Sequence, residues 1–465
     1  TVNLNLISQK ASLFISRAQS VYSGLKSYQT NLNTKIKNDV DRINEIGKRI
    51  YELNTEIQRI EAGGFETAMT SRDERDSLLD ELGSLAKISY SESFDGIVKV
   101  KLEGTDFILE SAVYQIGTYK DLETGFLTPY WNQLSEPAAD DYYEVFNTDT
   151  IDALNNNDIG EVKSLLLSRG DKYATYRDII NLNSDQYEKG ISNSVMLNTE
   201  AELDYMIHSL VTSVNDLLAP NIDFSKTDIY QGGTTTISGK DELGNTYDIS
   251  ASSITITDSA GRTKTISGTV KVLDEENVIL GEDGELPPHE LFSRTGAERY
   301  TAVNYTDAGG EAKTIYVYNE EDWSDTATCY TINSLSVNKD VVEDSSYIPH
   351  KKVNGNIAYD MAENIYNLWE NKDFRLNPSD KTPCSYSEFY TKMVGDLATM
   401  GSVYRTTSES LQGTVETIES NRQAVIGVSS DEELTNMIKF QNAYNASSRY
   451  INTVSQMIDY LLSSL

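Results

Sequence analysis

One short stretch of the sequence begins like a metalloprotease motif. The run is His289-Glu290-Leu291-Phe292-Ser293, and Ser293 stands where the pattern H-E-x-x-H requires its second histidine. A single imidazole does not hold a zinc ion, and the chain has only 3 histidines in all. We therefore interpret the run as a loop after Pro287-Pro288 and predict neither a metal site nor a protease there.

A group of carboxylates just before this run could bind calcium. Its members, with no Lys or Arg close by, are Asp274, Glu275, Glu276, Glu282, Asp283 and Glu285. Calcium needs about six to eight oxygen ligands, and the order D-x-D-x-D-G that would supply them is missing. The sequence therefore favours a solvated acidic loop over a calcium site.

The remaining candidates for chemistry are weaker. The run Gly233–Asp241 resembles a phosphate-binding loop, but its spacing is one residue too long and Asp241 stands where Ser or Thr is needed. His208 lies between Ile207 and Leu210 at helical spacing, which favours a core or boundary histidine. The sequence has no G-x-S-x-G nucleophile pattern. We predict that the protein is not an enzyme and binds no cofactor.

The composition argues against several classes of partner. The chain has 465 residues, of which 72 are acidic and 39 basic, giving a formal net charge of -33. A surface this acidic repels nucleic acid and anionic membranes, so we predict neither as a partner. No apolar run approaches the roughly 20 residues that cross a bilayer. Cys329 and Cys384 form no C-x-x-C pair and are predicted to be two free thiols.

The elements that would position these residues are mostly long helices. Residues 1–62 predict one helix, and Gly63-Gly64 would end it. Its apolar residues recur at spacings of three and four and therefore form a stripe on one face. The stripe consists of Ile36, Val40, Ile43, Ile46, Ile50, Leu53, Ile57 and Ile60. A second helix is predicted from Thr70 to Ala86. Helical character returns between Gly160 and Leu218, before Pro220.

Alternating patterns predict two β regions. Residues 97–109 alternate and predict a hairpin near 95–110, whereas residues 110–150 are predicted to be irregular. Residues 221–350 are rich in Thr, Ser, Gly and Tyr, with short alternating runs between turns such as Asp258–Gly261. We predict that this segment is a small all-β domain inserted between helical regions.

The C-terminal helices carry apolar stripes. The first stripe runs from Phe389 to Val425 and ends before Gly427. Ser430 and Glu433 then predict a capping box at the start of a final helix. The stripe of that final helix is Met437, Phe440, Tyr444, Ile451, Ile458 and Leu462. Because an apolar stripe at a chain end needs a partner, we predict that it is an assembly surface.

The tail of the sequence also carries a family motif. The pattern N-R-x-x-x-x-G-V-N-L-D-E-E is met by Asn421, Arg422 and Gly427, with Ser429-Ser430 in place of its Asn-Leu. The run Lys439–Ala446 then matches K-F-Q-x-A-Y-x-A. Both patterns resemble the C-terminus of the flagellar hook-associated protein 1 family.

A second, internal motif has the same resemblance. Residues 72–82 are similar to the family's L-R-D-Q-R-D-x-L-L-D-E-L, with Arg72, Asp73, Arg75 and Asp76 in place. This motif favours the family over hook and rod proteins, which share part of the tail pattern. The family's N-terminal helix has no counterpart at the start of this sequence, so we expect the chain to lack that N-terminal segment.

The patterns and the resemblance together imply an α+β fold. We expect an elongated helical rod of long coiled helices, with a side hairpin and an inserted all-β domain. The expected domains are residues 1–220 (rod with hairpin), 221–350 (β-rich domain), 351–428 (rod) and 429–465 (terminal assembly helix).

The resemblance further implies a structural subunit of the bacterial flagellum at the junction between hook and filament, exported by the flagellar type III apparatus to the cell exterior. Its implied partners are the hook protein, hook-associated protein 3, its own copies in a ring, and an export chaperone at the terminal helix. Two alternatives stay open. One is another axial protein, such as hook-associated protein 3 or a flagellin-like protein, and the other is an extracellular binding module carried by the β domain.

Overall fold

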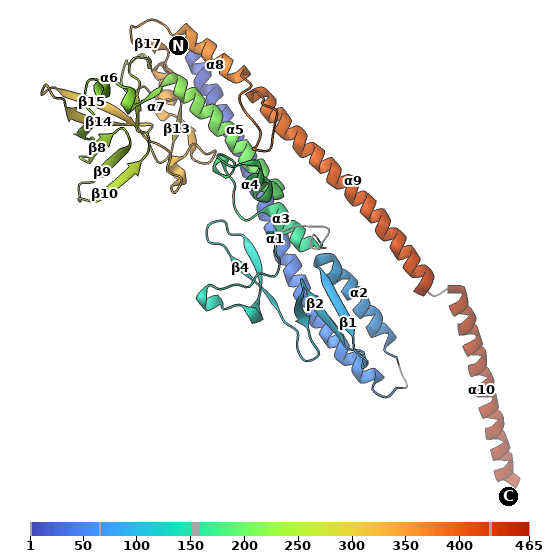
Figure 1. The fold of residues 1–465 in the computed structure, drawn as a ribbon. Helices are drawn as coiled ribbons and strands as arrows, with labels where there is room; N and C mark the ends of the chain where they lie inside the picture. Colours follow the sequence, from blue (N-terminus) through green and yellow to red (C-terminus); the bar gives the residue numbers. More distant parts are fainter. Residues whose placement is uncertain (1, 65–66, 150–158, 427–429, 465) are drawn as a thin grey trace. The chain divides into compact units, whose positions relative to one another are not determined.

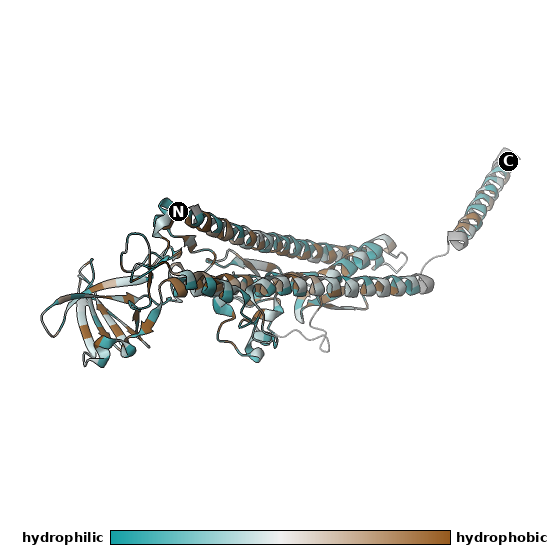
Figure 2. Ribbon diagram, turned by 90° about the horizontal axis from the view of Figure 1, so that it is seen from above, coloured by the Kyte–Doolittle hydropathy of each residue, from teal (hydrophilic) through white to brown (hydrophobic). Residues whose placement is uncertain are grey.

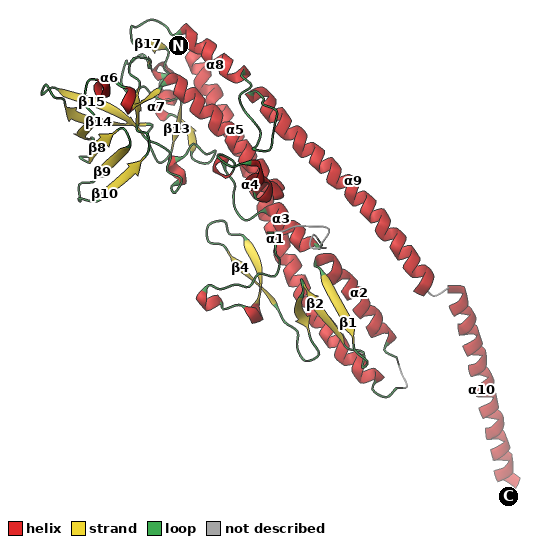
Figure 3. Cartoon of the chain, in the orientation of Figure 1, coloured by secondary structure: helices red, strands yellow, loops and turns green. Residues whose placement is uncertain are grey.

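The computed structural model describes residues 2–64, 67–149, 159–426 and 430–464 (Figure 1). Within these ranges it does not describe the side chains of Val2, of residues 423–433 or of residues 458–464. The chain forms two compact units, Thr1–Met393 and Val394–Leu465, which are described separately. Long helices and antiparallel sheets give the chain an α+β fold, as predicted (Figure 3).

Helix α1 (Val2–Glu61) is the longest element of the first unit, with 60 residues and therefore a length of about 90 Å. The predicted stripe faces the core up to Ile57, because Ile36, Val40, Ile43, Ile46, Ile50, Leu53 and Ile57 are each at most 1% exposed, whereas its last residue, Ile60, is only partly buried. Gly64 follows the helix with a φ of 68°, which glycine adopts without strain. The prediction of one helix ended by a glycine pair is confirmed.

The stripe of α1 packs against α2 (Met69–Leu85) and a three-stranded antiparallel sheet. The sheet has the order β1 (Ile88–Glu92), β2 (Val98–Leu102), β3 (Thr105–Ile108). Strands β2 and β3 form the hairpin predicted near 95–110, which is confirmed. The sequence reasoning missed β1, which is exposed along most of its length and therefore lacks an alternating pattern.

The prediction that residues 110–150 are irregular is wrong. Strands β4 (Ile116–Lys120) and β5 (Leu127–Trp131) pair antiparallel along their whole length. Gly117 and Pro129 are poor strand formers, so they hid the pattern. The ring of Tyr130 lies over Gly117, where an added Cβ would come within 2.6 Å of it, and Trp131 is fully buried. Packing across the hairpin and onto α1 stabilises what local propensity does not.

Shorter helices lead to a long central one, α5. Helices α3 (Glu161–Arg169) and α4 (Ser184–Lys189) precede α5 (Val195–Leu218), whose apolar face includes the buried Leu203, Ile207 and Val214. Short 3-10 turns lie at Asn132–Leu134, Pro137–Ala139, Tyr176–Asp178, Ile191–Asn193, Phe224–Lys226, Thr326–Thr328 and Ser345–Tyr347.

The segment predicted to be all-β contains an eight-stranded antiparallel sheet. Its spatial order is β10 (Thr263–Ser267), β9 (Ser253–Thr257), β8 (Thr246–Ser250), β7 (Thr236–Lys240), β14 (Tyr300–Thr306), β15 (Ala312–Tyr318), β11 (Lys271–Leu273), β6 (Asn221–Asp223). Hydrophobic and hydrophilic residues alternate along its strands (Figure 2). Asp258 accepts a backbone hydrogen bond in the predicted turn Asp258–Gly261, and Asp307 does so in the turn between β14 and β15. The run that resembles a phosphate-binding loop contains strand β7.

Small elements join this sheet to the helices. They are α6 (Asp228–Gln231), β12 (Ile279–Leu280), β13 (Phe292–Arg294), β16 (Leu335–Val337), α7 (Lys339–Glu343), β17 (Lys351–Lys352) and α8 (Tyr359–Glu370). Strand β12 pairs with β17, and β13 pairs with β16. Cys329 and Cys384 are buried and free, as predicted.

Two long helices end the chain, α9 (Tyr386–Ile426) and α10 (Ser430–Ser464). Helix α9 begins in the first unit, where Phe389 and Met393 are buried in the core beside α5. Among the described residues, every helix falls short of the length and apolarity needed to cross a membrane.

Candidate assembly surface

The first arginine of the internal motif joins α2 to the end of α1. Arg72 Nε and Nη2 donate to the two carboxylate oxygens of Glu61 at 2.7 and 2.6 Å, which is a bidentate pair. Its Nη1 donates to Glu92 on β1 at 2.7 Å. Hydrogen bonding to Arg72 lowers the pKa of Glu61 to about 2. Arg72 therefore connects three elements at one end of this packed region.

The second arginine of the motif is buried. Arg75 is 1% exposed, and its Nη1 donates to the backbone oxygen of Gly96 at 2.6 Å and to Asn54 Oδ1 at 3.2 Å. Its Nη2 donates to Glu92 at 3.2 Å. Arg75 stands four residues before Leu79 and so continues the buried face of α2. It holds the turn before β2 against α1.

The other predicted site residues are less constrained by contacts. Asp73 and Asp76 are exposed on α2. Asn421 and Arg422 are exposed on α9, where Arg422 lies 3.5 Å from Glu419. Gly427 and the side chains of Ser430 and Glu433 lie outside the described residues. The roles of all these residues stay predictions.

Three asparagines of α1 hold the two hairpins, and the sequence reasoning assigned none of them this role. Asn54 pairs with both backbone groups of Val98 on β2, at 2.8 and 3.1 Å. Asn44 does the same with Ile116 on β4, at 2.9 Å in both directions. Asn33 Oδ1 accepts from the N–H of Leu127 on β5 at 2.7 Å. Each asparagine amide bonds backbone groups of a strand residue that has no neighbouring strand on that side. Helix α1 therefore takes the place of that neighbour.

Asn44→Ala should lower the free energy of unfolding by about 1–3 kcal/mol, because it leaves the N–H and C=O of Ile116 without partners. Asn31→Ala is the matched control, since Asn31 is exposed on the same helix and gains the same helix propensity. Urea unfolding of both variants checks the prediction. Equal stability of the two would show that the paired hydrogen bonds of Asn44 contribute nothing.

The predicted assembly stripe lies on the second unit, on α10. Met437, Phe440, Tyr444 and Ile451 are 63%, 75%, 75% and 66% exposed. Their spacing of three, four and seven residues places them on one face of the helix. The side chains of Ile458 and Leu462 lie outside the described residues. The described residues of α9 in this unit show the same feature, with Leu397, Tyr404, Leu411, Val415 and Ile418 exposed.

The exposure of large apolar side chains along both helices is unfavourable in water. Soluble monomers rarely expose a continuous apolar patch of more than a few hundred Å², and larger ones mark interaction sites. A helix that is exposed on all sides also lacks the tertiary packing from which most helical stability comes. The stripe of α10 is thus a candidate interaction surface, and its role in assembly stays a prediction.

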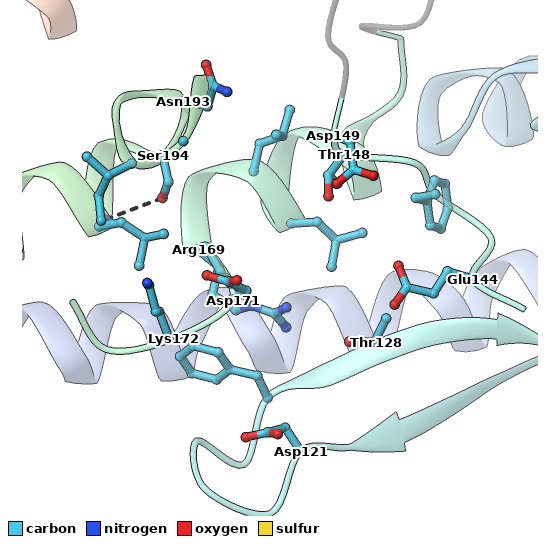
Figure 4. A pocket seen from close by; sticks show the side chains of 18 of the residues that line it. Asp121, Thr128, Glu144, Thr148, Asp149, Arg169, Asp171, Lys172, Asn193 and Ser194 are labelled. Atoms are coloured by element: carbon cyan, nitrogen blue, oxygen red, sulfur yellow. Dashed lines mark hydrogen bonds between the residues drawn. The ribbon is translucent and has the colours of Figure 1, made fainter. Parts of the chain in front are cut away.

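A pocket of ≈ 600 Å³ lies on the first unit (Figure 4). Its walls come from the β4–β5 hairpin, residues 144–149, α3 and the start of α5. The lining carries acidic and basic groups together, namely Asp121, Glu144, Asp149, Asp171, Arg169, Lys172 and Lys189. None of the described residues that line it is a histidine or a cysteine.

The buried cation of this pocket has a structural role. Arg169 is 3% exposed and donates to Asn33 Oδ1 and to the backbone oxygens of Leu127 and Gly170, at 2.7, 2.8 and 3.0 Å. Burial lowers its pKa to about 10, since these acceptors are neutral. The side chain thereby joins α3 to α1 and β5 at the wall of the pocket.

Helix α5 carries buried carboxylates that fix neighbouring loops, among them Glu200 and Asp204. Glu200 accepts the N–H of Ala174 at 2.9 Å, and Asp204 accepts the N–H groups of Tyr176 and Ile332 at 2.9 and 2.7 Å. Burial raises the pKa of Glu200 to about 7 and that of Asp204 to about 6. These acids bond backbone groups 26 to 128 residues away in sequence.

The run that begins like a metalloprotease motif contributes another buried acid. Glu290 is 4% exposed and accepts the hydroxyl of Tyr330 at 2.7 Å and the amide of Asn215 at 3.3 Å. Burial raises its pKa to about 7. Ser293 lies on strand β13 beside Ser336 rather than on a helix. The carboxylate of Glu290 therefore lies in the core between α5 and Tyr330.

Two family descriptions match the chain. The flagellar hook-associated protein FlgK helical domain matches residues 5–230, and the flagellar basal body rod FlgEFG protein C-terminal region matches residues 420–464. Flagellar hook-associated protein 1 of Bacillus subtilis (strain 168) is 21% identical over 465 residues, which are 99% of this chain and 71% of the relative. The solved flagellar hook junction protein FlgK from Burkholderia pseudomallei has a TM-score of 0.47 and 14% identity, covering 92% of this chain and 90% of that chain.

The matched ranges contain the features described above. Residues 5–230 include nearly all of α1, with the three asparagines that hold the hairpins, and the contacts of Arg72 and Arg75. Residues 420–464 include α10 and its apolar stripe. Together with the relative, which is matched over 99% of this chain and 71% of its own length, these matches show that the chain carries a FlgK helical domain and is similar to flagellar hook-associated protein 1.

Proposed function

We propose that this protein is a structural subunit of the bacterial flagellum that forms the junction between hook and filament. The observation that carries the proposal is the match of residues 5–230 to the FlgK helical domain, beside an axial-protein C-terminal match at residues 420–464. The first match favours this role over those of hook-associated protein 3 and flagellin.

The contacts within the first unit suit a subunit that must withstand mechanical force. Hydrogen bonds from asparagines fix the two hairpins to α1, and the two motif arginines add further contacts between these elements. Together they form one packed body. The 221–350 segment supplies a separate β-sheet core, which we propose is a projecting domain. The proposed domain plan is a rod of residues 1–220 and 351–428, this β domain, and a terminal assembly helix from residue 429.

The partners follow from the exposed stripe. We infer that α10 packs against other axial subunits (the hook protein, hook-associated protein 3 or its own copies) and that an export chaperone covers it before assembly. The subunit would then be exported unfolded by the flagellar type III apparatus and act outside the cell. Its relatives are structural flagellar proteins, and the proposed work is contact between subunits rather than catalysis.

Deletion of the gene tests the proposal. We expect bare hooks by electron microscopy and unpolymerised flagellin in the medium, because the filament would have no adapter to grow from. Complementation with the full gene should restore filaments. Normal filaments in the deletion strain would refute the junction role.

Ile451→Asp should weaken binding to the chaperone at least tenfold, alone and more so together with Ile458→Asp. Burying a side chain of this size contributes about 1.5–3 kcal/mol, and a buried carboxylate adds a desolvation cost. Calorimetry with the purified full chain and chaperone checks this. Unchanged affinity would contradict the assignment of the stripe.

Asn442→Asp is the matched control for that experiment. It adds the same negative charge to α10, nine residues before Ile451 and thus about half a turn away on the opposite face. Its affinity should stay close to that of the unsubstituted chain. A loss equal to that of Ile451→Asp would mean that charge, and not the stripe, decides binding.

A further inference from the structure

A histidine and two carboxylates converge on the loop between β12 and β13. Asp283, Glu285 and His289 place one ligand atom each within 4.8 Å of the others. His289 Nε2 lies 3.2 Å from Asp283 Oδ2. The other ring nitrogen, Nδ1, lies 3.3 Å from Asp340 Oδ2 on α7. The ring is thus flanked by carboxylates on both of its nitrogens.

We propose that Asp283, Glu285 and His289 bind a divalent transition-metal ion such as Zn²⁺, with Asp340 as the positioning residue for His289. This inference does not depend on the proposed junction role. It departs from the sequence-based prediction, in which His289 lacked a second histidine partner and the acidic stretch was a solvated loop.

The two contacts of the imidazole carry the argument. A neutral imidazole has one N–H donor and one lone pair. With Nδ1 turned toward Asp340, Nε2 faces the carboxylate of Asp283 at 3.2 Å, so a cation placed between these two atoms would be bound by both. A carboxylate on the far nitrogen is also the usual partner of a metal-bound histidine, since it fixes the tautomer and the ring orientation.

The spacing of the ligand atoms fits a small metal ion. Zinc bonds to nitrogen and oxygen are about 2.0–2.2 Å long, so two ligands of a tetrahedral site lie ~3.3 Å apart. The 3.2 Å between Nε2 and Oδ2 is close to that value. Glu285 is exposed, so its side chain can close the remaining distance by rotation. Water would supply the fourth ligand.

The surroundings hold these groups in place. The imidazole stacks on Tyr347 with centroids 5.0 Å apart and 17° between the planes. The N–H of Glu282 donates to the oxygen of Ser346 at 3.0 Å, and the N–H of Asn338 donates to Leu291 at 3.1 Å. The loop that carries the ligands is therefore tied on both sides to the segment that carries Asp340 and Tyr347.

The donor set decides the class of metal. One imidazole and two carboxylates suit zinc and similar transition metals, whereas calcium needs about six to eight oxygen ligands. Deep burial is not required, but Asp283 has only 15% of its side chain exposed. That shielding strengthens its attraction to a cation.

Calorimetry of the metal-free full chain with Zn²⁺ tests the proposal, with the visible absorption of Co²⁺ as a readout of coordination. We expect one ion per chain. His289→Gln should abolish this binding, Glu285→Gln should weaken it, and Asp340→Asn should weaken it about 10- to 100-fold through the lost positioning. Glu285 is exposed, so its variant stays informative even if the His289 variant is unstable.

His350→Gln is the matched control, because His350 also contacts a carboxylate, with Nε2 3.5 Å from Glu282, yet belongs to no ligand cluster among the described residues. Its affinity should match that of the unsubstituted chain. The proposal is overturned by absent Zn²⁺ binding, or by binding that His289→Gln leaves unchanged. Equally tight Ca²⁺ binding that survives His289→Gln would also overturn it, since that would indicate an all-oxygen site.

Discussion

The free energy of unfolding of this protein should fall as the pH rises from about 5 to about 8. The cause is the set of buried acids Glu200, Asp204 and Glu290, whose pKa burial raises to about 7, about 6 and about 7. Each accepts hydrogen bonds, but those bonds do not offset the loss of water around the charge. The folded protein therefore holds protons that the unfolded chain has already released.

The direction follows from the proton balance. Below the ordinary pKa values of glutamate and aspartate, 4.5 and 3.8, both states hold these protons and the contribution to stability is fully present. As the pH rises through the folded-state values, the folded protein must ionise buried groups and the contribution is lost. One pKa unit corresponds to about 1.4 kcal/mol, so the three acids together change stability by several kcal/mol.

Other carboxylates act in the opposite direction at lower pH. Hydrogen bonds from Arg72 lower the pKa of Glu61 to about 2, and those from Ser324 and Lys264 lower the pKa of Asp322 to about 2. Their contribution is present above the ordinary pKa values of these side chains and is lost on acidification. Both side chains are partly exposed and screened by water, so their effect is small. Stability should therefore be greatest near pH ~5.

Thermal melts between about pH 5 and about pH 8 check this slope. The net charge of -33 also grows more repulsive as the pH rises, so the variants Glu200→Gln and Glu290→Gln are needed to isolate the buried acids. Each should flatten the slope and raise the melting temperature at high pH. Glu276→Gln removes an exposed charge and should not flatten it. A slope equal in all four proteins would contradict the prediction.

Periodicity predicted the helices because their spacing is a local property. The α1 stripe from Ile36 to Ile57 specifies one buried face whatever packs on it, and its burial agrees. The β4–β5 hairpin was missed because its stability is not local. Its strands contain Gly117 and Pro129, and they pair with amides of Asn44 and Asn33 from a helix 72 and 94 residues earlier in sequence.

The candidate site residues also divide into those that follow from local spacing and those that depend on contacts between distant segments. The exposed stripe of α10 follows from its spacing alone, although its partner stays a prediction. Asp340 could not be predicted as a neighbour of His289, because it reaches the ring from a different element. One missed feature did have a signal. Arg75 stands four and seven residues before Leu79 and Leu82, so the helical period places it on the buried face of α2.

Arg75→Ala should lower the stability of the α1–α2 region by about 2–4 kcal/mol, the largest loss expected from a single substitution here. The change leaves the oxygens of Gly96 and Asn54 without this donor and empties a fully buried volume. Glu92 is 40% exposed and can be rehydrated, so its lost ion pair adds little. Arg75→Lys should be nearly as damaging, since an ammonium group cannot donate as a planar fork.

A single tryptophan can report on this region alone. Trp131 is fully buried in the same core as Leu79 and Leu82, while Trp323 and Trp369 lie outside it and are exposed. In a Trp323→Phe/Trp369→Phe background, urea unfolding followed by Trp131 fluorescence therefore measures the packing that Arg75 supports. We expect the midpoint to fall sharply for Arg75→Ala.

The matched control lies one turn earlier in the same motif. Arg72→Ala removes a bidentate ion pair whose side chains remain 28% and 21% exposed, so water replaces most of what is lost. Such pairs contribute about 0–1 kcal/mol, several times less than the buried arginine. Similar losses for the two variants would mean that the motif acts through its charge. A much larger loss for Arg75→Ala would mean that the motif stabilises the region through the buried contact of Arg75 with the turn before β2. The first arginine of the motif, Arg72, could then be replaced without unfolding the region.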